Sequence, residues 1–226
     1  MRYGVFVLAS GLLWSVSAQA GLLAPEQFEA GRYLPPPPAA DSAATRTELE
    51  ELHAIAAHST PEQRAVAAHD AKDEKADMFN AAIGFDLSTM PETFKLLTMV
   101  GDEEVDDTKV AKAYFHRNRP YAADPSLQTC TPVKPGKAAN SYPSGHSTLA
   151  FSMGVVLASV MPEKATAILV RSSEYAEHRL VCGMHYRSDI VAGQQFGTII
   201  ALKLMENPTF LAQMAKAKAE LRAAHI

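Results

Sequence analysis

The sequence predicts an all-α protein, built as one compact helical bundle. From Thr45 onward, helix caps, helix breakers and the spacing of apolar residues favour helices almost throughout. No stretch of useful length alternates between apolar and polar residues as a half-buried strand would, and no internal repeat is present. Residues 21–226 are enough for one domain with a sizeable core, so a single helical domain is expected over residues 45–226.

The amino terminus is typical of a cleaved secretory signal. Arg2 precedes an apolar run from Val5 to Val16, and Ser17-Ala18-Gln19-Ala20 provides a small-residue cleavage site. The apolar run is too short for a firm membrane anchor, and no later stretch reaches about 18 uninterrupted apolar residues. We therefore expect residues 1–20 to be removed, the mature protein to be periplasmic or secreted, and no integral membrane segment to remain.

The charge composition excludes some classes of partner. A formal net charge of -4 over 226 residues, with no long block of Lys and Arg, does not provide the attraction that nucleic acids or anionic membranes require. No nucleic-acid partner is therefore expected. Any positive charge that binds an anion has to be local.

The chain before the helical domain is expected to form an extended arm over residues 21–44. Its Pro35 to Pro38 run is stiff, solvated and unable to continue a helix. A first helix is predicted over Thr45 to Ala57, which is rich in Ala, Leu and Glu. Thr60-Pro61-Glu62-Gln63 is a capping box with proline at the first helical position, so a second helix begins there.

Two further helices are expected before the middle of the chain. Met90-Pro91-Glu92 begins one that Gly101 can end, and Asp102 can cap another that runs to about Asn118, where Arg119-Pro120 breaks it. Acidic residues fill the first turn of the second helix, where carboxylates suit the helix dipole. We expect them to form a solvated face rather than a metal site; they are Glu103, Glu104, Asp106 and Asp107.

A long proline-rich loop is predicted from Tyr121 to Tyr142, and compact domains tolerate such a loop mainly when it shapes a site. Leu149 to Met161 is nearly all apolar but short, so it is expected to be a helix buried on most sides. Two more helices are predicted, from Glu163 to about Val181 and from Ile190 to Met205. The latter carries two glycines spaced for close packing against a neighbour, Gly193 and Gly197.

The two cysteines, Cys130 and Cys182, are expected to form a disulfide. The export signal implies an oxidising compartment, where an even pair of cysteines is more readily a disulfide than two free thiols. Two buried thiols are the alternative. A metal site is not expected, because neither cysteine belongs to a C-x-x-C unit.

Two clusters of candidate site residues lie at predicted breaks between helices. In Lys112-x6-Arg119-Pro120, seven residues make about two helical turns, which would project both cations from one face; a solvated basic face is the alternative. Pro143-Ser144-Gly145-His146 leads directly into the buried helix. Helix N-termini present unpaired N–H groups, and Gly145 lets the backbone approach an oxyanion closely, although Ser144 could serve only as a cap.

The third cluster is Arg179-x5-His185-x3-Asp189, with a turn at Gly183. A carboxylate four residues after a histidine, at a helix start, can accept from one imidazole nitrogen and leave the other free to attack. A purely structural His–Asp hydrogen bond is the alternative. Together the three clusters contain the cations, backbone donors, nucleophile and acid that phosphoryl transfer needs.

In this order, the clusters resemble the signature of the type 2 phosphatidic acid phosphatase and vanadium haloperoxidase superfamily. That signature is K-x6-R-P, then P-S-G-H, then S-R-x5-H-x3-D. Within it the chain is similar to the class A bacterial non-specific acid phosphatases, which share its signal peptide, its size and a Tyr-Leu-Pro-Pro-Pro-Pro run, here starting at Tyr33. The resemblance is strongest from Lys112 to Gly193. His178 departs from it, because the family has serine there.

The resemblance implies a role for each matched residue. His185 would attack phosphorus to form a phosphohistidine, Asp189 would orient it, and His146 would protonate the leaving alcohol. Three cations would hold the phosphate oxygens, with a serine hydroxyl and glycine backbone donors beside them: Lys112, Arg119, Arg179, Ser144 and Gly145.

The function that the resemblance implies is an exported acid phosphatase that acts on small-molecule phosphate monoesters without a metal or other cofactor. It also allows a homo-oligomer. A phosphotransferase to alcohol or nucleoside acceptors differs only in the acceptor that reaches the phosphohistidine, and a vanadate-dependent haloperoxidase would use the same cage. An anion-binding protein without turnover is disfavoured, because nucleophile, orienting acid and general acid are all present.

Overall fold

The computed structural model describes residues 21–23, 29–72, 74–133 and 135–226, and this part of the chain is helical and contains no strand. The predicted all-α fold is therefore confirmed. The helices are α1 (Ala30–Tyr33), α2 (Ala43–His58), α3 (Pro61–Asp70), η2 (Ala76–Phe79), α4 (Asn80–Ile83), η3 (Leu87–Thr89), α5 (Pro91–Phe115), α6 (Pro120–Ala123), α7 (Gly145–Val160), η4 (Pro162–Lys164), α8 (Ala165–Val181), α9 (Arg187–Leu204) and α10 (Pro208–Ala223).

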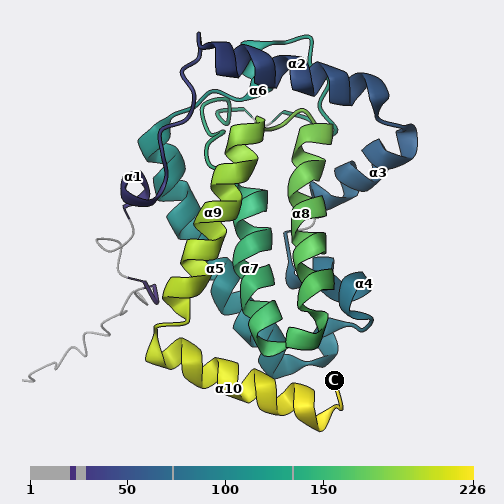
Figure 1. Ribbon diagram of the computed structural model, residues 1–226, viewed down its shortest axis with the longest axis vertical. Coiled ribbons are helices and arrows are strands. Elements are labelled where there is room, and N and C mark those ends of the chain that lie inside the picture. The colour runs from purple at the N-terminus through teal and green to yellow at the C-terminus, as the bar shows by residue number, and fades with distance from the viewer. Residues whose placement is uncertain (1–20, 24–28, 73, 134) are drawn as a thin grey trace, which may run out of the picture.

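Helix α7 is the centre of the bundle. It packs against α5, α8 and α9, and ten of its 16 residues are buried, as expected for an apolar helix too short to span a membrane. Figure 1 shows α7, α8 and α9 side by side, with α10 crossing one end and α2 the other. The main core lies between α5, α7, α8, α9 and α10 and includes the fully buried Leu97, Leu157, Ile168, Phe196 and Phe210. None of the helices in the described ranges is long and apolar enough to cross a membrane.

Helix α5 differs from the prediction of two helices. It runs without a break from Pro91 through Gly101 to Phe115. A Cβ atom at position 101 would lie 2.9 Å from the flexible end of the Met153 side chain, so this glycine lies within the helix and faces α7. The helix also ends earlier than Asn118, because the next residue, His116, takes a left-handed conformation with φ of 50°.

The acidic run in α5 is not the solvated face that its composition indicated. The Glu103 side chain is buried and accepts hydrogen bonds from the backbone N–H groups of Leu22 (2.7 Å) and Leu23 (3.0 Å). Glu104 is also buried, accepts a hydrogen bond from Thr108 Oγ1 at 2.6 Å, and has its pKa raised to about 8 by burial. These two carboxylates face the protein because α5 is packed on more than one side.

Most other predicted boundaries lie within a few residues of those observed. Several short helices were not predicted, among them η2, α4 and η3, and α6 overlaps the start of the expected Tyr121 to Tyr142 loop. The capping box of Thr60 and Gln63 is present at the start of α3. Within the expected arm, the short helix α1 buries Ala30, and Pro35 accepts a hydrogen bond from the hydroxyl of Tyr142 at 2.7 Å. Helix α10 was not predicted as a separate element, although Asn207-Pro208 is a cap followed by proline at the first helical position.

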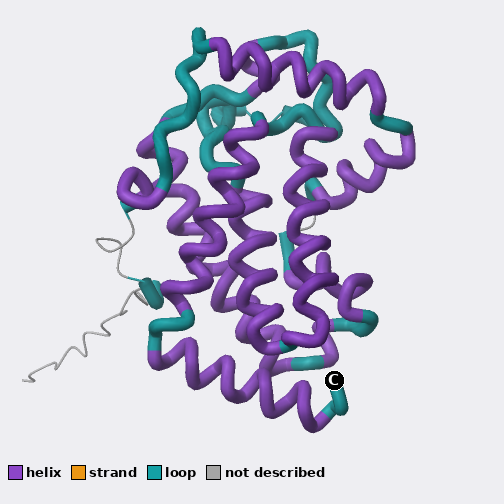
Figure 2. Tube along the Cα trace, in the orientation of Figure 1, coloured by secondary structure: helices purple, strands orange, loops and turns teal. Residues whose placement is uncertain are grey.

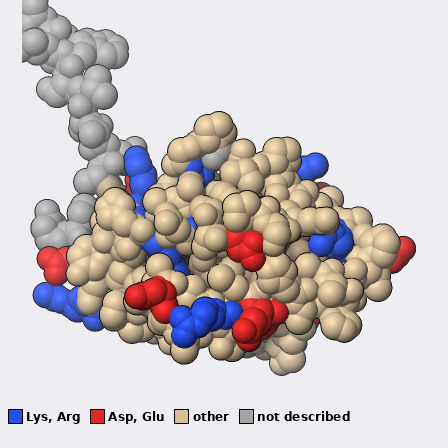
Figure 3. Space-filling view, turned by 90° about the horizontal axis from the view of Figure 1, so that it is seen from above, with Lys and Arg blue, Asp and Glu red and all other residues tan. Residues whose placement is uncertain are grey.

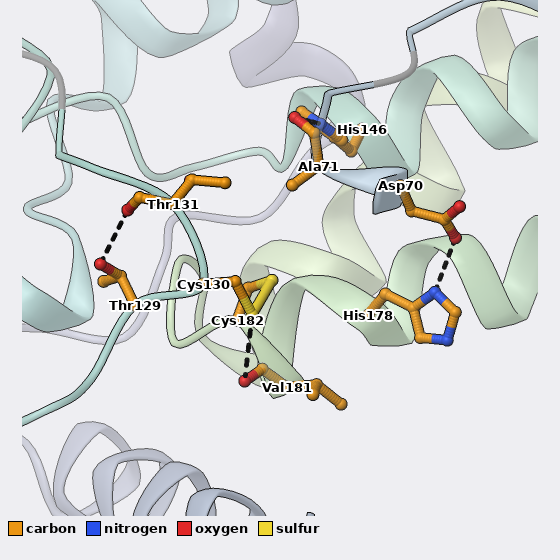
Figure 4. Close-up of a disulfide and its surroundings, with 9 residues drawn as sticks. All are labelled: Asp70, Ala71, Thr129, Cys130, Thr131, His146, His178, Val181 and Cys182. Carbon is orange, nitrogen blue, oxygen red and sulfur yellow. Dashed lines mark hydrogen bonds and ion pairs between the residues drawn. A yellow bond between two sulfur atoms is a disulfide. The ribbon is translucent and has the colours of Figure 1, made fainter. Parts of the chain in front are cut away.

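The cysteines Cys130 and Cys182 form a disulfide, which confirms that prediction. The bond joins the loop before α7 to the residue that follows α8, and Cys130 N–H also donates to the carbonyl of Cys182 at 3.3 Å. Figure 4 shows the bond beside the last turn of α8. It fastens the long loop to the turn that carries His185.

The close packing of α7 and α9 generates a stability prediction. A Cβ atom at Gly197 would lie 2.3 Å from the carbonyl oxygen of Thr148 and 2.9 Å from the backbone nitrogen of Ser152, and neither atom can move without shifting α7. We expect Gly197→Ala to lower the free energy of unfolding by about 1–3 kcal/mol, the usual effect of overpacking. Urea denaturation of the mature chain measures this change.

The exposed Gln195 on the same helix provides the matched control. Gln195→Ala should change the free energy of unfolding by less than about 0.5 kcal/mol, as surface substitutions usually do. Equal stability of the Gly197→Ala and Gln195→Ala proteins would contradict the proposed contact.

Candidate active site

All three sequence clusters meet at the end of the bundle where α7 and α9 begin and α8 ends (Figure 1). Figure 2 shows loops gathered at this end, beneath α2. Two of the contacts join the clusters directly: Arg119 lies 3.1 Å from His185, and Ser144 N–H donates to the carbonyl of Asp189 at 3.0 Å. A Cβ atom at Gly145 would lie 3.1 Å from Nζ of Lys112. The structure thus brings the predicted site residues together.

Arg119 lies in the site, but it is not placed there by the helix that its spacing from Lys112 indicated. Because α5 ends at Phe115, Arg119 lies beyond the helix, at the N-cap of α6, and the helical alignment with Lys112 was wrong. The N–H of Arg119 donates to the carbonyl of Ala138 at 2.7 Å, and its guanidinium donates to the carbonyl of Met184 at 3.0 Å. Tertiary contacts with two other segments therefore place this side chain.

The His185 ring is held in one protonation state by its neighbours. Nε2 lies 3.1 Å from Nη1 of Arg119, and Nδ1 lies 3.4 Å from Oδ2 of Asp189. A guanidinium can only donate, so Nε2 accepts and the ring proton is on Nδ1. Burial, reinforced by the charges of Arg119, Lys112 and Arg179, holds the pKa of His185 well below its ordinary value. The ring is therefore neutral, with an electron pair on Nε2.

Asp189 is fully buried, and its carboxylate is surrounded by donors. Oδ1 accepts from Nη1 of Arg117 at 2.7 Å, and Oδ2 accepts from Oγ of Ser141 at 2.5 Å and from the N–H of Tyr186 at 2.9 Å. Burial raises the pKa of Asp189, and Arg117 opposes that rise. These donors fix the carboxylate beside Nδ1 of His185.

Arg117 and Ser141 are site residues that the sequence reasoning missed. Arg117 is buried, donates to Glu48 of α2 at 2.8 Å as well as to Asp189, and stacks 4.0 Å above the centre of the Tyr186 ring. Its place two residues before Arg119 was the available signal. However, the sequence around Arg117 does not indicate that this arginine is buried.

Three cations line the site, and some of their donors have no protein partner. The Nε atom of Arg119 and the Nε and Nη1 atoms of Arg179 are buried without a hydrogen-bond partner in the described part of the chain. Burial, together with the charge of Arg119, lowers the pKa of Lys112 to about 8 and that of Arg179 to about 10. Buried donors and like charges at close range are both stabilised by an anion that several of them share.

The start of α7 adds backbone donors to this cage. Ser144 caps the helix, because its Oγ accepts from the N–H of Ser147 (3.4 Å) and from Oγ of Ser147 (3.0 Å). The N–H groups of Gly145 and His146 lie in the first helical turn, where N–H groups lack helical partners and the dipole favours an anion. Seen from this end, charged groups of both signs are scattered over the surface, so the positive charge of the site is local (Figure 3).

The His146 side chain is mostly buried beside the cage. Its ring stacks on Tyr175 with centres 5.6 Å apart, and its side chain is 13% exposed. Burial, with the charges of Arg179 and Lys112, holds the pKa of His146 well below its ordinary value. Protonation of this ring therefore requires negative charge nearby.

His178, which stands where the family has serine, makes its contact with Asp70, outside the cage. Nδ1 of His178 lies 2.6 Å from Oδ2 of Asp70, the last residue of α3, and Figure 4 shows this pair. Arg171 donates to both oxygens of the same carboxylate, at 2.9 and 2.8 Å. His178 thus ties α8 to α3.

The partnering of Arg117 generates a second stability prediction. Arg117→Ala leaves the buried carboxylates of Asp189 and Glu48 without their cation, so we expect the free energy of unfolding to fall by about 3–5 kcal/mol. Arg187 provides the control, because it pairs with two carboxylates, Glu51 and Glu177, but is 36% exposed. Arg187→Ala should lower the free energy by no more than about 1 kcal/mol in the same urea titration. Losses of equal size would contradict the structural role of Arg117.

Comparisons with known proteins agree with this geometry. Residues 95–211 match the model of the PAP2 superfamily. The chain is 32% identical to the "Non-specific acid phosphatase" of Salmonella typhimurium strain LT2, over 84% of this chain and 78% of the relative. It is 33% identical to the "Non-specific acid phosphatase" of Providencia stuartii, over 83% and 78%. It is 30% identical to the "Acid phosphatase" of Zymomonas mobilis, over 96% and 87%. The chain belongs to the PAP2 superfamily.

Proposed function

We propose that this protein is an acid phosphatase that hydrolyses phosphate monoesters through a phosphohistidine on His185. The observation that carries the proposal is the buried His185 ring, whose Nε2 lies 3.1 Å from Arg119 within a cage formed by Lys112, Arg119 and Arg179. The names of the relatives, acid phosphatase and non-specific acid phosphatase, support the same activity.

In the first step, the phosphate dianion of the substrate binds to Lys112, Arg119 and Arg179. Arg119 exchanges its contact with His185 for a phosphate oxygen, which frees the Nε2 electron pair. Nε2 then attacks phosphorus, and the bond from phosphorus to the leaving oxygen breaks. His146 donates its proton to that oxygen, so an alcohol departs rather than an alkoxide.

In the second step, water attacks the phosphohistidine. His146, now neutral, accepts a proton from the water, the bond between phosphorus and Nε2 breaks, and inorganic phosphate is released. The ring of His185 is positively charged while it is phosphorylated, and the carboxylate of Asp189 beside Nδ1 stabilises that charge. The scheme uses the protein's own groups and needs no metal or other cofactor.

The two histidines have to hold opposite protonation states, and bound phosphate supplies the difference. Without an anion, burial and the nearby cations, among them Lys112 and Arg179, disfavour a proton on either ring. The negative charge of the phosphate offsets the cations and favours the proton on His146, whereas Nε2 of His185 is used for the bond to phosphorus. Substrate binding therefore prepares the general acid.

The proposal also places the enzyme outside the cytoplasm, in the periplasm or the medium. The support is the signal sequence, with its apolar run and cleavage site in residues 1–20. These residues lie outside those that the structure describes.

The nucleophile assignment is tested by substitution. His185→Ala removes the electron pair that attacks phosphorus, so we expect no turnover of p-nitrophenyl phosphate by the mature protein in the presence of EDTA, with an unchanged helical circular dichroism spectrum. His58→Ala, which alters an exposed histidine of α2, should retain the wild-type rate.

Wild-type rates from a folded His185→Ala protein would overturn the assignment. Loss of wild-type activity in EDTA, restored by one particular metal ion, would overturn the metal-free scheme.

A further inference from the structure

Both ring nitrogens of His146 face oxygen acceptors from the segment that follows α3. Nδ1 lies 3.3 Å from Oε1 of Glu74, and Nε2 lies 3.4 Å from the carbonyl oxygen of Ala71. A neutral imidazole has one donor and one acceptor, whereas an imidazolium has two donors. Two acceptors therefore match the protonated form of His146, which is the form that a general acid needs.

The segment that carries these acceptors is fastened at its start. Asp70, the last residue of α3, is buried and bound by both terminal nitrogens of Arg171 and by His178. Both partners belong to α8, and the next residue along the chain is Ala71. Figure 4 shows the contact between Asp70 and His178, with Ala71 beside His146. The anchor on α8 thus holds the carbonyl of Ala71 beside the histidine.

The remaining charges around His146 all oppose its protonation. Arg179 comes from α8 and Lys112 from α5, and both, after burial itself, disfavour the imidazolium. A proton on His185, in the turn before α9, would do the same. Glu74 is the carboxylate in direct contact with the ring. Its negative charge favours the proton at this short distance, and the hydrogen bond to the carbonyl of Ala71 also raises the pKa of His146.

We propose that Glu74 is the positioning residue of the general acid: its carboxylate holds Nδ1–H of His146, favours the protonated form of the ring and directs Nε2 to the leaving oxygen. Nε2 then exchanges its long contact with Ala71 for the leaving oxygen, while Glu74 keeps its own contact. This inference rests on the proposed function and adds a residue that lies outside the three sequence clusters.

The expected effect is modest, because the side chain of Glu74 is 64% exposed and solvent weakens its charge. A carboxylate favours the protonated ring and so raises the pKa of His146. Glu74→Gln removes that charge, and His146 loses its proton at lower pH. The alkaline limb of the kcat/KM profile should then move to lower pH by roughly half a unit, which reduces kcat/KM about threefold above that limb.

The experiment measures kcat/KM against pH for two substrates with each variant of the mature protein. An alkyl phosphate needs a protonated leaving group, whereas p-nitrophenyl phosphate releases a stable anion. We expect Glu74→Gln to lower kcat/KM for the alkyl ester and to change it little for the aryl ester. Glu74→Lys should move the limb further in the same direction, because it replaces an attractive charge by a repulsive one.

Asp77→Asn is the matched control, since it removes an exposed carboxylate three residues along the chain in η2. It should leave the limb and the ratio between the two substrates unchanged. An unchanged limb and ratio in both Glu74 variants would overturn the inference, and so would an equal shift in Asp77→Asn, because bulk charge would then explain it.

His146→Ala separates this inference from the proposed function. If His146 is the general acid, the variant loses about 10²- to 10⁴-fold with the alkyl ester, less with the aryl ester, and its alkaline limb disappears. If His146→Ala shows this pattern but the Glu74 variants match the wild type, only the role of Glu74 is wrong. If His146→Ala shows no such pattern, the general-acid assignment itself is wrong.

Discussion

The buried carboxylate of Asp189 sets the geometry of the site, because a charge removed from water has to be matched by donors that the fold brings to it. Arg117 lies after α5, Ser141 lies in the loop before α7, and Tyr186 directly precedes α9. Satisfying one carboxylate therefore fixes three segments of the chain relative to one another. The same carboxylate lies beside Nδ1 of His185, so the nucleophile is oriented by the contacts that stabilise the fold.

The buried arginines at this end of the bundle divide by how they are partnered. Arg117 uses its terminal nitrogens on Glu48, Ser188 and Asp189, so it holds the structure and has little left to offer a ligand. Arg119 and Arg179 keep buried donors without partners in the described ranges. Buried donors without partners lower the free energy of unfolding, and a bound anion that accepts hydrogen bonds from them raises it again. Phosphate affinity and protein stability are thus opposed at these two positions, as at many functional sites.

Local signals in the sequence were sufficient for the fold class, because a capping box such as that at Thr60 acts within a few residues. The three clusters were each ambiguous alone, and their match, in order, to a family signature singled out the residues that meet at this end of the bundle. What could not be predicted depends on tertiary packing. Gly101 can end a helix but here faces α7, Glu103 is buried only because the amino-terminal segment packs on it, and Arg117 differs from a surface arginine only through distant carboxylates.

The proposed mechanism requires that Nε2 of His185 attacks phosphorus. Trapping the phosphorylated enzyme tests this step directly. The mature protein is mixed with a phosphate monoester and quenched within milliseconds in alkali, where phosphohistidine persists, and its peptides are then analysed by mass spectrometry. The account predicts a phosphoryl group on His185 and none on the same peptide from His185→Ala. A phosphoryl group on another residue, or rapid turnover with His185 unmodified at every quench time, would contradict it.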